Sequence, residues 1–315
     1  MKAIQITAFG GPEVMQYTDL PDPVAGGSEI VLDVTAVGIN YADTHQTENS
    51  YLSPQTLPMV PGIEVTGTHA GKRYLASVSS GGYAQKAIAH EAALIPIPDA
   101  VTDQQALCML VQGSTAWHLL KTMGSVKPGQ TVVIHAAAGG VGTIAIQLAK
   151  MWGAKVIAVT SSKEKIDLAK SLGADEVVDA RDPDLGKALR AANGGRGVDL
   201  VLEMVGGTTF DQSLVALGNF GKLITFGMAS RTPPTPIHPG SLMHGSKTVA
   251  GFWLANCFGK KELMNDVIAE LFALVASGKL RPVIGSTYPL SKAADAHRAM
   301  LARETTGKVA LDPAL

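Results

Sequence analysis

The chain has 315 residues, and its 26 basic side chains nearly balance 27 acidic ones, which leaves a formal net charge of -1. This length suits two domains or one large α/β unit with a sizeable core. The charge balance provides no basic stripe for a phosphate backbone, so nucleic acid is not an expected partner. No apolar run approaches the roughly 18 residues of a membrane span, and the first residues lack the apolar region of a leader peptide. We therefore expect a soluble cytoplasmic protein that does not bind a membrane.

Only two cysteines occur, Cys108 and Cys257. Two thiols cannot build a disulfide framework or a four-cysteine zinc site. We expect each to be a small buried apolar residue.

Residues 1–110 are rich in β-branched runs separated by Gly and Pro, which indicates a β-rich domain. From about Ala106 the pattern changes, because helical stretches at 103–123 and 143–152 alternate with short buried strands. Strands separated by helices predict βαβ units and a parallel sheet over residues 111–245. Residues 246–315 contain a strand-like TVAGFWL, a helix near 261–277 and a closing KVAL, and resemble the front of the chain. The sequence thus predicts a nucleotide-binding domain inserted between two parts of a β-rich domain.

A glycine-rich turn follows the strand at 131–135 and leads into a helix with apolar spacing from Thr143. Small residues at Ala137 and Gly139 allow a tight turn and let backbone N–H groups approach a pyrophosphate, while Gly142 permits close packing of the helix. The unpaired amides at the helix N-terminus then bind the phosphate charge. This order of elements predicts a dinucleotide site.

The next strand, 155–160, is expected to end beside the adenosine ribose of the dinucleotide. NAD-specific proteins place an acid there, but this chain has Ser161, Ser162, Lys163 and Lys165. Hydroxyl and ammonium groups suit a 2′-phosphate, whose two negative charges an aspartate would repel. The sequence therefore favours NADPH over NADH, although Ser162 could instead cap the next helix and the lysines could simply be solvated.

Several motifs along the chain resemble the quinone oxidoreductase and ζ-crystallin branch of the medium-chain dehydrogenase/reductase superfamily. The motifs are MKAI…FGGPEV, VGINYAD at 37–43, VPGIE at 60–64, GGYA at 81–84, AAGGVG at 137–142 and TGKV at 306–309. This resemblance implies a doubly wound Rossmann domain, an α/β fold with a parallel sheet, joined to a GroES-like β-rich catalytic domain. It also implies a homodimer, formed through the strand that precedes Trp253.

The resemblance implies cofactor contacts from the glycine turn, from the tips of the following strands and from the end of the chain. These are Thr115, Ala138, Gly139, Gly140, Val141, Gly142, Ser161, Lys165, Gly227, Phe252 and Lys308. Some NADPH-using relatives place a tyrosine near the 2′-phosphate at the position that is Ala180 here, so one expected contact is missing.

Zinc-dependent alcohol dehydrogenases of the superfamily have metal ligands where this chain has Asn40, Ile63 and Val111. We therefore expect no metal, and hence no Lewis acid for alcohol oxidation. The remaining chemistry is hydride transfer from NADPH to a quinone or an α,β-unsaturated carbonyl compound. Two alternatives stay open: an enoyl-thioester reductase of a polyketide or fatty-acid pathway, and a non-catalytic NADPH-binding protein.

Asn40 and Tyr51 are the candidate catalytic residues, since the segment that carries them lines the substrate side of the nicotinamide in relatives. An amide or phenol there could donate a hydrogen bond to the acceptor carbonyl and stabilise the charge that forms. Asn40 could equally satisfy neighbouring backbone groups, and Tyr51 could be an ordinary aromatic wall.

Overall fold

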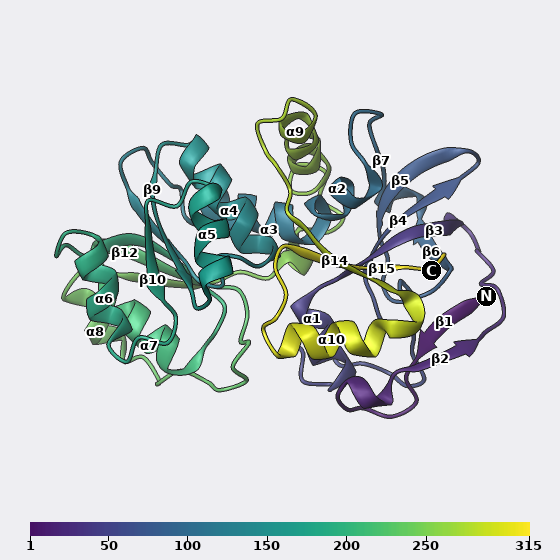
Figure 1. The fold of residues 1–315 in the computed structure, drawn as a ribbon, viewed down its shortest axis with the longest axis horizontal. Helices are drawn as coiled ribbons and strands as arrows, with labels where there is room; N and C mark the ends of the chain where they lie inside the picture. The colour runs from purple at the N-terminus through teal and green to yellow at the C-terminus, as the bar shows by residue number, and fades with distance from the viewer. The chain divides into compact units, whose positions relative to one another are not determined.

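The chain folds into two units, which the computed structural model describes over residues 1–315 (Figure 1). Unit 1 comprises Met1–Gln112 and Phe258–Leu315, and unit 2 comprises Gly113–Cys257. The inserted arrangement expected from the sequence is present, but the chain returns to unit 1 later than residue 246. The physical reason is strand pairing, because Thr248–Gly251 joins the sheet of unit 2 through residues 222–225.

The centre of unit 2 is a six-stranded sheet with the order β10-β9-β8-β11-β12-β13. Every neighbouring pair in it is parallel. The strands are β8 (Thr131–Ile134), β9 (Lys155–Thr160), β10 (Glu176–Asp179), β11 (Val198–Glu203), β12 (Leu217–Thr225) and β13 (Thr248–Gly251). The helices of this unit are α3 (Ser114–His118), α4 (Gly140–Met151), α5 (Lys163–Ser171), α6 (Leu185–Ala192), α7 (Gly207–Ala216) and α8 (Pro239–Met243).

Right-handed crossovers place helices on both faces of this sheet. The chain moves outward from β8 to β9 and β10 through α4 and α5, and then returns past β8 to β11 and β12 through α6 and α7. The first pair of helices therefore covers one face and the second pair covers the other, as the left part of Figure 1 shows. Because both faces are covered, the central strands read as nearly continuous apolar runs. The strand order reverses between β8 and β11, which is where such sheets bind ligands.

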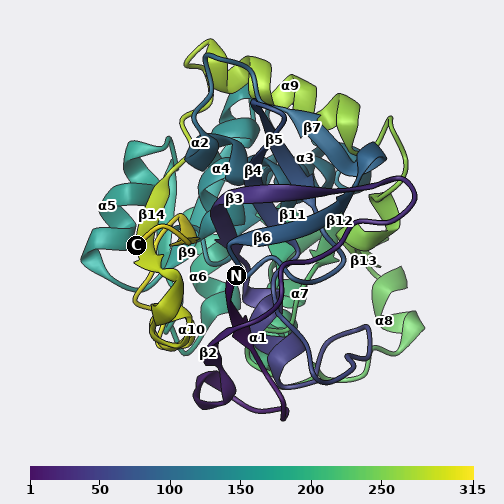
Figure 2. The same ribbon diagram turned by 90° about the vertical axis from the view of Figure 1, so that its right-hand side faces the viewer.

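Unit 1 is built on a seven-stranded sheet with the order β14-β15-β3-β4-β5-β7, in which β6 pairs with β3. Its strands are β3 (Glu29–Ile39), β4 (Glu64–His69), β5 (Lys72–Ser77), β6 (Lys86–His90), β7 (Leu94–Pro96), β14 (Ile284–Pro289) and β15 (Lys308–Asp312), beside a separate pair of β1 (Lys2–Gln5) and β2 (Gln16–Asp19). Only β14 and β15 pair in parallel. Figure 2 shows β3 and β6 side by side.

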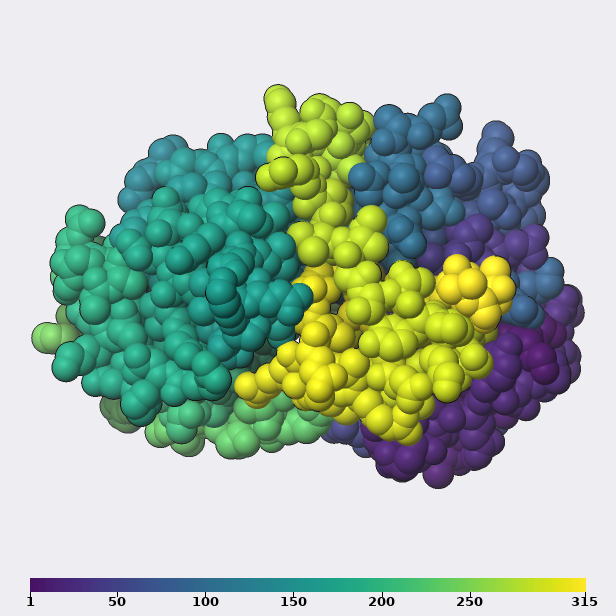
Figure 3. Space-filling model, in the orientation of Figure 1, coloured from purple at the N-terminus to yellow at the C-terminus, as the bar shows by residue number.

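The carboxyl-terminal part of the chain completes the core of unit 1. The helices of this unit are α1 (Tyr41–Thr47), α2 (Asp103–Leu107), α9 (Asn265–Ala276) and α10 (Ala293–Leu301). Leu290, Ala293 and Leu311 pack in one cluster with Leu32 and Val65 from the first part of the chain. In Figure 3 the yellow carboxyl-terminal residues accordingly lie against the purple amino-terminal ones.

The single helix expected over 103–123 is a succession of short helical pieces. After α2 come a π-helical turn at Met109–Gly113, then α3, then a second π-helical turn at Leu119–Met123. No helix of the chain has the length and apolar composition that a membrane span requires.

Candidate functional site

The glycine turn of unit 2 has the geometry of a phosphate cradle. It joins the carboxyl end of β8 to α4, with Ala136 at a φ of 47° and the amide of Gly139 donating to the Ala136 carbonyl at 2.8 Å. Gly139 is the N-cap of α4, and no side chain caps this end of the helix. The first amides of α4 are therefore left for a ligand, and a helix N-terminus favours an anion.

Gly142 is required by close packing inside the turn. A Cβ atom at this position would lie 2.5 Å from the Ala136 carbonyl oxygen and 2.7 Å from the Ala137 Cα atom. Both are backbone atoms, so they cannot move aside as a flexible side chain could. The turn keeps its shape only because residue 142 has no side chain.

The loops that carry the predicted cofactor residues of unit 2 lie along one edge of its sheet. All six strands are parallel, so their carboxyl ends share that edge. The turn at 138–142 follows β8, Ser161 and Lys165 follow β9, Gly227 follows β12, and Phe252 follows β13. Along this edge from β9 to β13, the residues predicted to contact the ribose, the pyrophosphate and the nicotinamide therefore follow one another in that order.

The chain leads from the tip of β9 into α5, whose N-terminus is capped by a side chain. The Ser162 hydroxyl accepts a hydrogen bond from the Lys165 amide at 3.3 Å, so the capping role considered for Ser162 is confirmed. The Lys163 ammonium pairs with Asp167 at 2.7 Å on the exposed side of the helix. Ser161 and Lys165 stay the predicted 2′-phosphate contacts of this tip.

Thr115 lies on α3, which packs against α4. The neighbouring His118 ring lies 5.7 Å from the Phe252 ring, which ties α3 to the end of β13. The Phe252 amide donates to the Thr225 carbonyl at 2.8 Å. The Phe252 amide is therefore occupied in the sheet, where it ties this residue to the end of β12.

Two polar residues that the sequence analysis did not single out stabilise this edge. Glu203 ends β11, and its Oε1 accepts hydrogen bonds from the amides of Val205 and Gly206 at 2.6 and 3.0 Å. Its burial raises the pKa of this carboxyl group. His135 directly follows β8, and its Nε2 lies 2.8 Å from the Ser213 hydroxyl. The sequence did contain a signal for these two residues, because each is a polar residue at or just after the end of a mostly apolar strand.

In unit 1, Asn40 belongs to a buried ion-pair network. Lys308 pairs with Glu64, and the two side chains are 2% and 0% exposed. The Lys308 ammonium also donates to Asn40 Oδ1 at 3.1 Å, while Asn40 Nδ2 donates to Glu64 at 3.0 Å. Between an ammonium donor and a carboxylate acceptor, the Asn40 amide can adopt only one orientation.

This network also contains Lys308, which we predicted as a cofactor contact. Its ammonium group is buried in unit 1 and bonds to Glu64 and Asn40, and the cofactor contact stays a prediction. Its position on β15 serves the interior of the unit, since an unpaired carboxylate at Glu64 would be costly there.

A second chain of buried hydrogen bonds runs from the start of α1 to α10. Asp43 Oδ2 accepts from the Asn40 amide and from the Tyr83 hydroxyl, both at 2.9 Å. The Tyr83 oxygen lies 2.9 Å from His297 Nε2, and because its proton goes to Asp43 it accepts the histidine proton. Burial raises the pKa of Asp43 to about 6 and lowers the pKa of His297 to about 4. Burial thus disfavours the charged form of both side chains.

Tyr51 lies in the loop that follows α1 and is partly buried. Its ring is 6.5 Å from the ring of His45, whose Nδ1 lies 3.0 Å from the Ser50 hydroxyl. Asn40 and Tyr51 therefore flank α1 within the same unit, and their catalytic roles stay a prediction.

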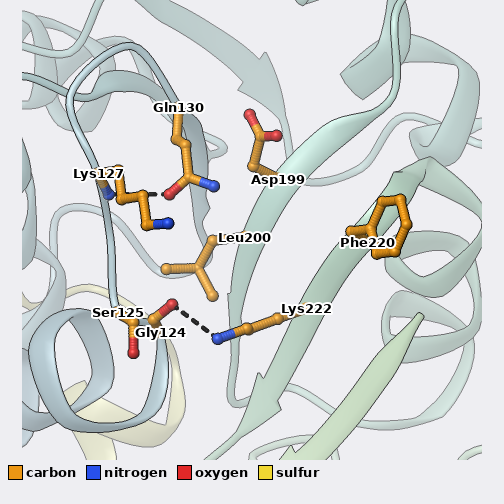
Figure 4. A pocket seen from close by; sticks show the side chains of 8 residues that line it. All are labelled: Gly124, Ser125, Lys127, Gln130, Asp199, Leu200, Phe220 and Lys222. Carbon is orange, nitrogen blue, oxygen red and sulfur yellow. Dashed lines mark hydrogen bonds between the residues drawn. The ribbon is translucent and has the colours of Figure 1, made fainter. Parts of the chain in front are cut away.

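A hollow of about 170 Å³ lies at the opposite edge of the unit 2 sheet, near the amino ends of β8 and β11 (Figure 4). It is lined by Gly124, Ser125, Lys127, Gln130, Asp199, Leu200, Phe220 and Lys222. Because the glycine turn follows the carboxyl end of β8, this hollow is not part of the cofactor edge.

No group of three or more His, Cys, Asp or Glu residues is placed to hold a metal ion. At the three positions discussed above, Asn40 is bound by Lys308 and Glu64, and the amide of Val111 donates to Glu64 at 2.8 Å. The polar groups near these positions are thus used in bonds to one another.

Residues 140–273 match the family model described as zinc-binding dehydrogenase. A quinone oxidoreductase from Pseudomonas aeruginosa is 33% identical, over 99% of each chain. The crystal structure of the Thermus thermophilus quinone oxidoreductase, also determined as a complex with NADPH, is 37% identical with a TM-score of 0.88 and covers 99% of this chain and 100% of its own. The Escherichia coli quinone oxidoreductase complexed with NADPH is 31% identical with a TM-score of 0.93 and the same coverage.

The doubly wound parallel sheet and its open glycine turn define a Rossmann-type dinucleotide-binding protein, joined here to a mostly antiparallel unit. These similarities then identify the family. The chain belongs to the quinone oxidoreductase branch of the medium-chain dehydrogenase/reductase superfamily. The fold class predicted from the sequence is confirmed.

Substitution of Gly142 tests the turn. Gly142→Ala is expected to destabilise the fold by about 1–3 kcal/mol, because its Cβ collides with backbone atoms, and to weaken NADPH binding at least about tenfold. Urea unfolding and NADPH titration measure the two effects. Gly26→Ala is the matched control, since a Cβ at Gly26 would meet nothing within 4 Å and this residue is not among the predicted cofactor contacts. Normal binding by Gly142→Ala would contradict the role assigned to this turn.

The buried titrating groups of unit 1 predict how stability depends on pH. In the unfolded chain Asp43 titrates near 3.8, whereas the pKa in the folded protein is about 6. The folded state therefore binds the proton first as pH falls, and Asp43 adds about 3 kcal/mol of stability between pH 6 and 4. His297 acts in the opposite direction, because its pKa is about 4 in the folded protein instead of 6.5. As the pH falls from 6.5 to 4, its contribution lowers the stability of the folded protein by about 3 kcal/mol.

Asp43→Asn removes the contribution of Asp43 to this pH dependence and leaves that of His297. The free energy of unfolding of the variant should fall about 3 kcal/mol further than that of the unaltered protein between pH 6.5 and 4. Urea unfolding across this range measures the difference, with Asp33→Asn at an exposed salt bridge as the control. Parallel pH profiles for Asp43→Asn and the unaltered protein would show that Asp43 does not titrate as its burial predicts.

Proposed function

We propose that this protein is an NADPH-dependent quinone reductase that reduces small quinones or α,β-unsaturated carbonyl compounds. The observation that carries the proposal is the open N-terminus of α4 behind a turn that Gly142 keeps tight, in a chain with full-length similarity to quinone oxidoreductases. Bound NADPH supplies a hydride, which together with one proton converts a quinone to a hydroquinone.

The residues of the two units have separate tasks in this proposal. The α4 amides bind the pyrophosphate, Ser161 and Lys165 bind the 2′-phosphate, and the backbone near Gly227 and Phe252 orients the nicotinamide. Asn40 donates its second amide N–H to the acceptor carbonyl, because the first goes to Glu64 and the oxygen is taken by Lys308. Tyr51 is the second donor proposed to contact the substrate.

The reaction needs no metal in this proposal, because the acceptor is already electrophilic. Asn40, Ile63 and Val111 stand where metal-dependent relatives have ligands, and the Asn40 amide is engaged by an ion pair. A cytoplasmic location is also proposed, since the chain has only two cysteines and both are buried, which suits a reducing compartment.

A spectrophotometric assay tests this function. NADPH absorbance should decrease on addition of 1,4-benzoquinone, with the same rate after prolonged treatment with EDTA or phenanthroline. Crotonyl thioester and a simple enone serve as parallel acceptors. Tight NADPH binding without oxidation by any acceptor would overturn the proposal, as would turnover confined to the thioester; activity lost on chelation would overturn its metal-free form.

We propose further that two copies associate through β13. This strand ends the sheet of unit 2, so one row of its backbone N–H and C=O groups has no partner strand within that sheet. Sedimentation velocity at micromolar concentration should give a particle of twice the 32.7 kDa chain mass. A particle of single-chain mass across the same range would contradict the dimer.

A further inference from the structure

Arg181 lies directly beside the tip of β9. The neighbouring strand β10 runs parallel to β9, with Asp179 opposite Thr160, and the Ala180 amide donates to the Thr160 carbonyl at 2.9 Å. The residues that follow the two strands therefore emerge together at the carboxyl edge of the sheet. Arg181 is brought next to Ser161, twenty positions earlier in the chain.

The Arg181 guanidinium is fixed in place by three hydrogen bonds. Its Nε donates to Asp179 Oδ1 at 3.0 Å, and its Nη2 donates to Asp179 Oδ2 and to the Ser161 carbonyl, both at 2.8 Å. These bonds use three of the five N–H groups of the guanidinium. The two on Nη1 have no protein partner, and 71% of the side chain is exposed. The group is thus oriented by the protein and still open to a ligand.

Two other polar side chains at this tip, Lys163 and Ser162, are less available to a phosphate. Lys163 is held by Asp167 on the solvent side of α5, and the Ser162 hydroxyl is occupied in capping the helix. A guanidinium presents a rigid pair of donors that matches phosphate oxygens, whereas an ammonium group is a point charge on a flexible stem. Asp179 partly offsets the charge of Arg181. It also holds the Arg181 side chain in one orientation before a ligand binds, so this side chain loses little rotational freedom on binding.

We infer that Arg181 binds the 2′-phosphate of NADPH through Nη1 and so distinguishes NADPH from NADH. It supplies from β10 the contact that Ala180, the preceding residue, cannot make. This inference rests on the proposed placement of the adenosine ribose at the tip of β9, and it adds a specificity residue to the two predicted from the sequence.

Arg181→Gln tests the inference, because glutamine lacks the positive charge and the paired N–H donors of the guanidinium. Isothermal titration should show the Kd for NADPH rising about 10- to 100-fold, with the Kd for NADH changed less than about twofold. The fragments 2′,5′-ADP and 5′-AMP should show the same selective loss without any catalytic step. Arg181→Lys should recover part of the NADPH affinity.

Arg196→Gln is the matched control, since Arg196 is exposed in the same unit but precedes β11, at the opposite edge of the sheet. Thermal unfolding of Arg181→Gln should match that of the unaltered protein, because an exposed ion pair contributes little to stability. Equal weakening of NADPH and NADH, or no weakening of either, would overturn the inference. If the unaltered protein binds 2′,5′-ADP no better than 5′-AMP, the inference also fails, while quinone reduction measured separately still stands.

Discussion

The buried carboxylate of Glu64 is the constraint on which unit 1 depends. Its side chain is fully buried, so its charge has to be compensated within the protein. Three donors from distant parts of the chain provide this: the Asn40 amide, the Val111 backbone N–H and the Lys308 ammonium. A Cβ on Gly38 would overlap both Glu64 and Lys308, so β3 has to carry a glycine there. Removal of any one partner would leave a polar group without compensation in a low-dielectric interior.

This network explains why the first and last parts of the chain form one unit around an inserted domain. Lys308 and Glu64 are 244 positions apart, and Tyr83 and His297 are 214 apart. The antiparallel pairing of β15 with β3 brings Lys308 to the end of the strand that leads into Asn40. Motifs that look independent in the sequence are therefore partners in space. Gly62 belongs to the same arrangement, since a side chain there would collide with the Tyr83 ring.

The sequence predicted unit 2 more completely than unit 1, for a physical reason. A strand, a tight turn and the N-terminus of a helix are contiguous in the chain, so the cradle before α4 could be inferred from local pattern. Partners of a buried charge are set by tertiary structure, so the pairing of Lys308 with Glu64 could not be inferred from local pattern. Residues 246–257 were placed in the wrong unit because a short strand after a proline-rich loop carries no local sign of the sheet it will join. Arg181 was missed since its nearness to Ser161 depends on strand order.

The two units differ in how far the polar groups of their candidate sites are already paired within the protein. In unit 2 the carboxyl edge keeps donors unused, at the uncapped start of α4 and at Arg181 Nη1. In unit 1 the donors and acceptors around Asn40 are nearly all paired with one another. A site with open donors attracts a charged cofactor, whereas a nearly saturated network holds one amide rigidly at a fixed angle. Rigid placement is what a group needs if it is to stabilise charge that exists only during reaction, because it then costs no reorganisation at that moment. The ion pair between Lys308 and Glu64 would accordingly affect the reaction through the orientation of Asn40, without itself contacting a substrate.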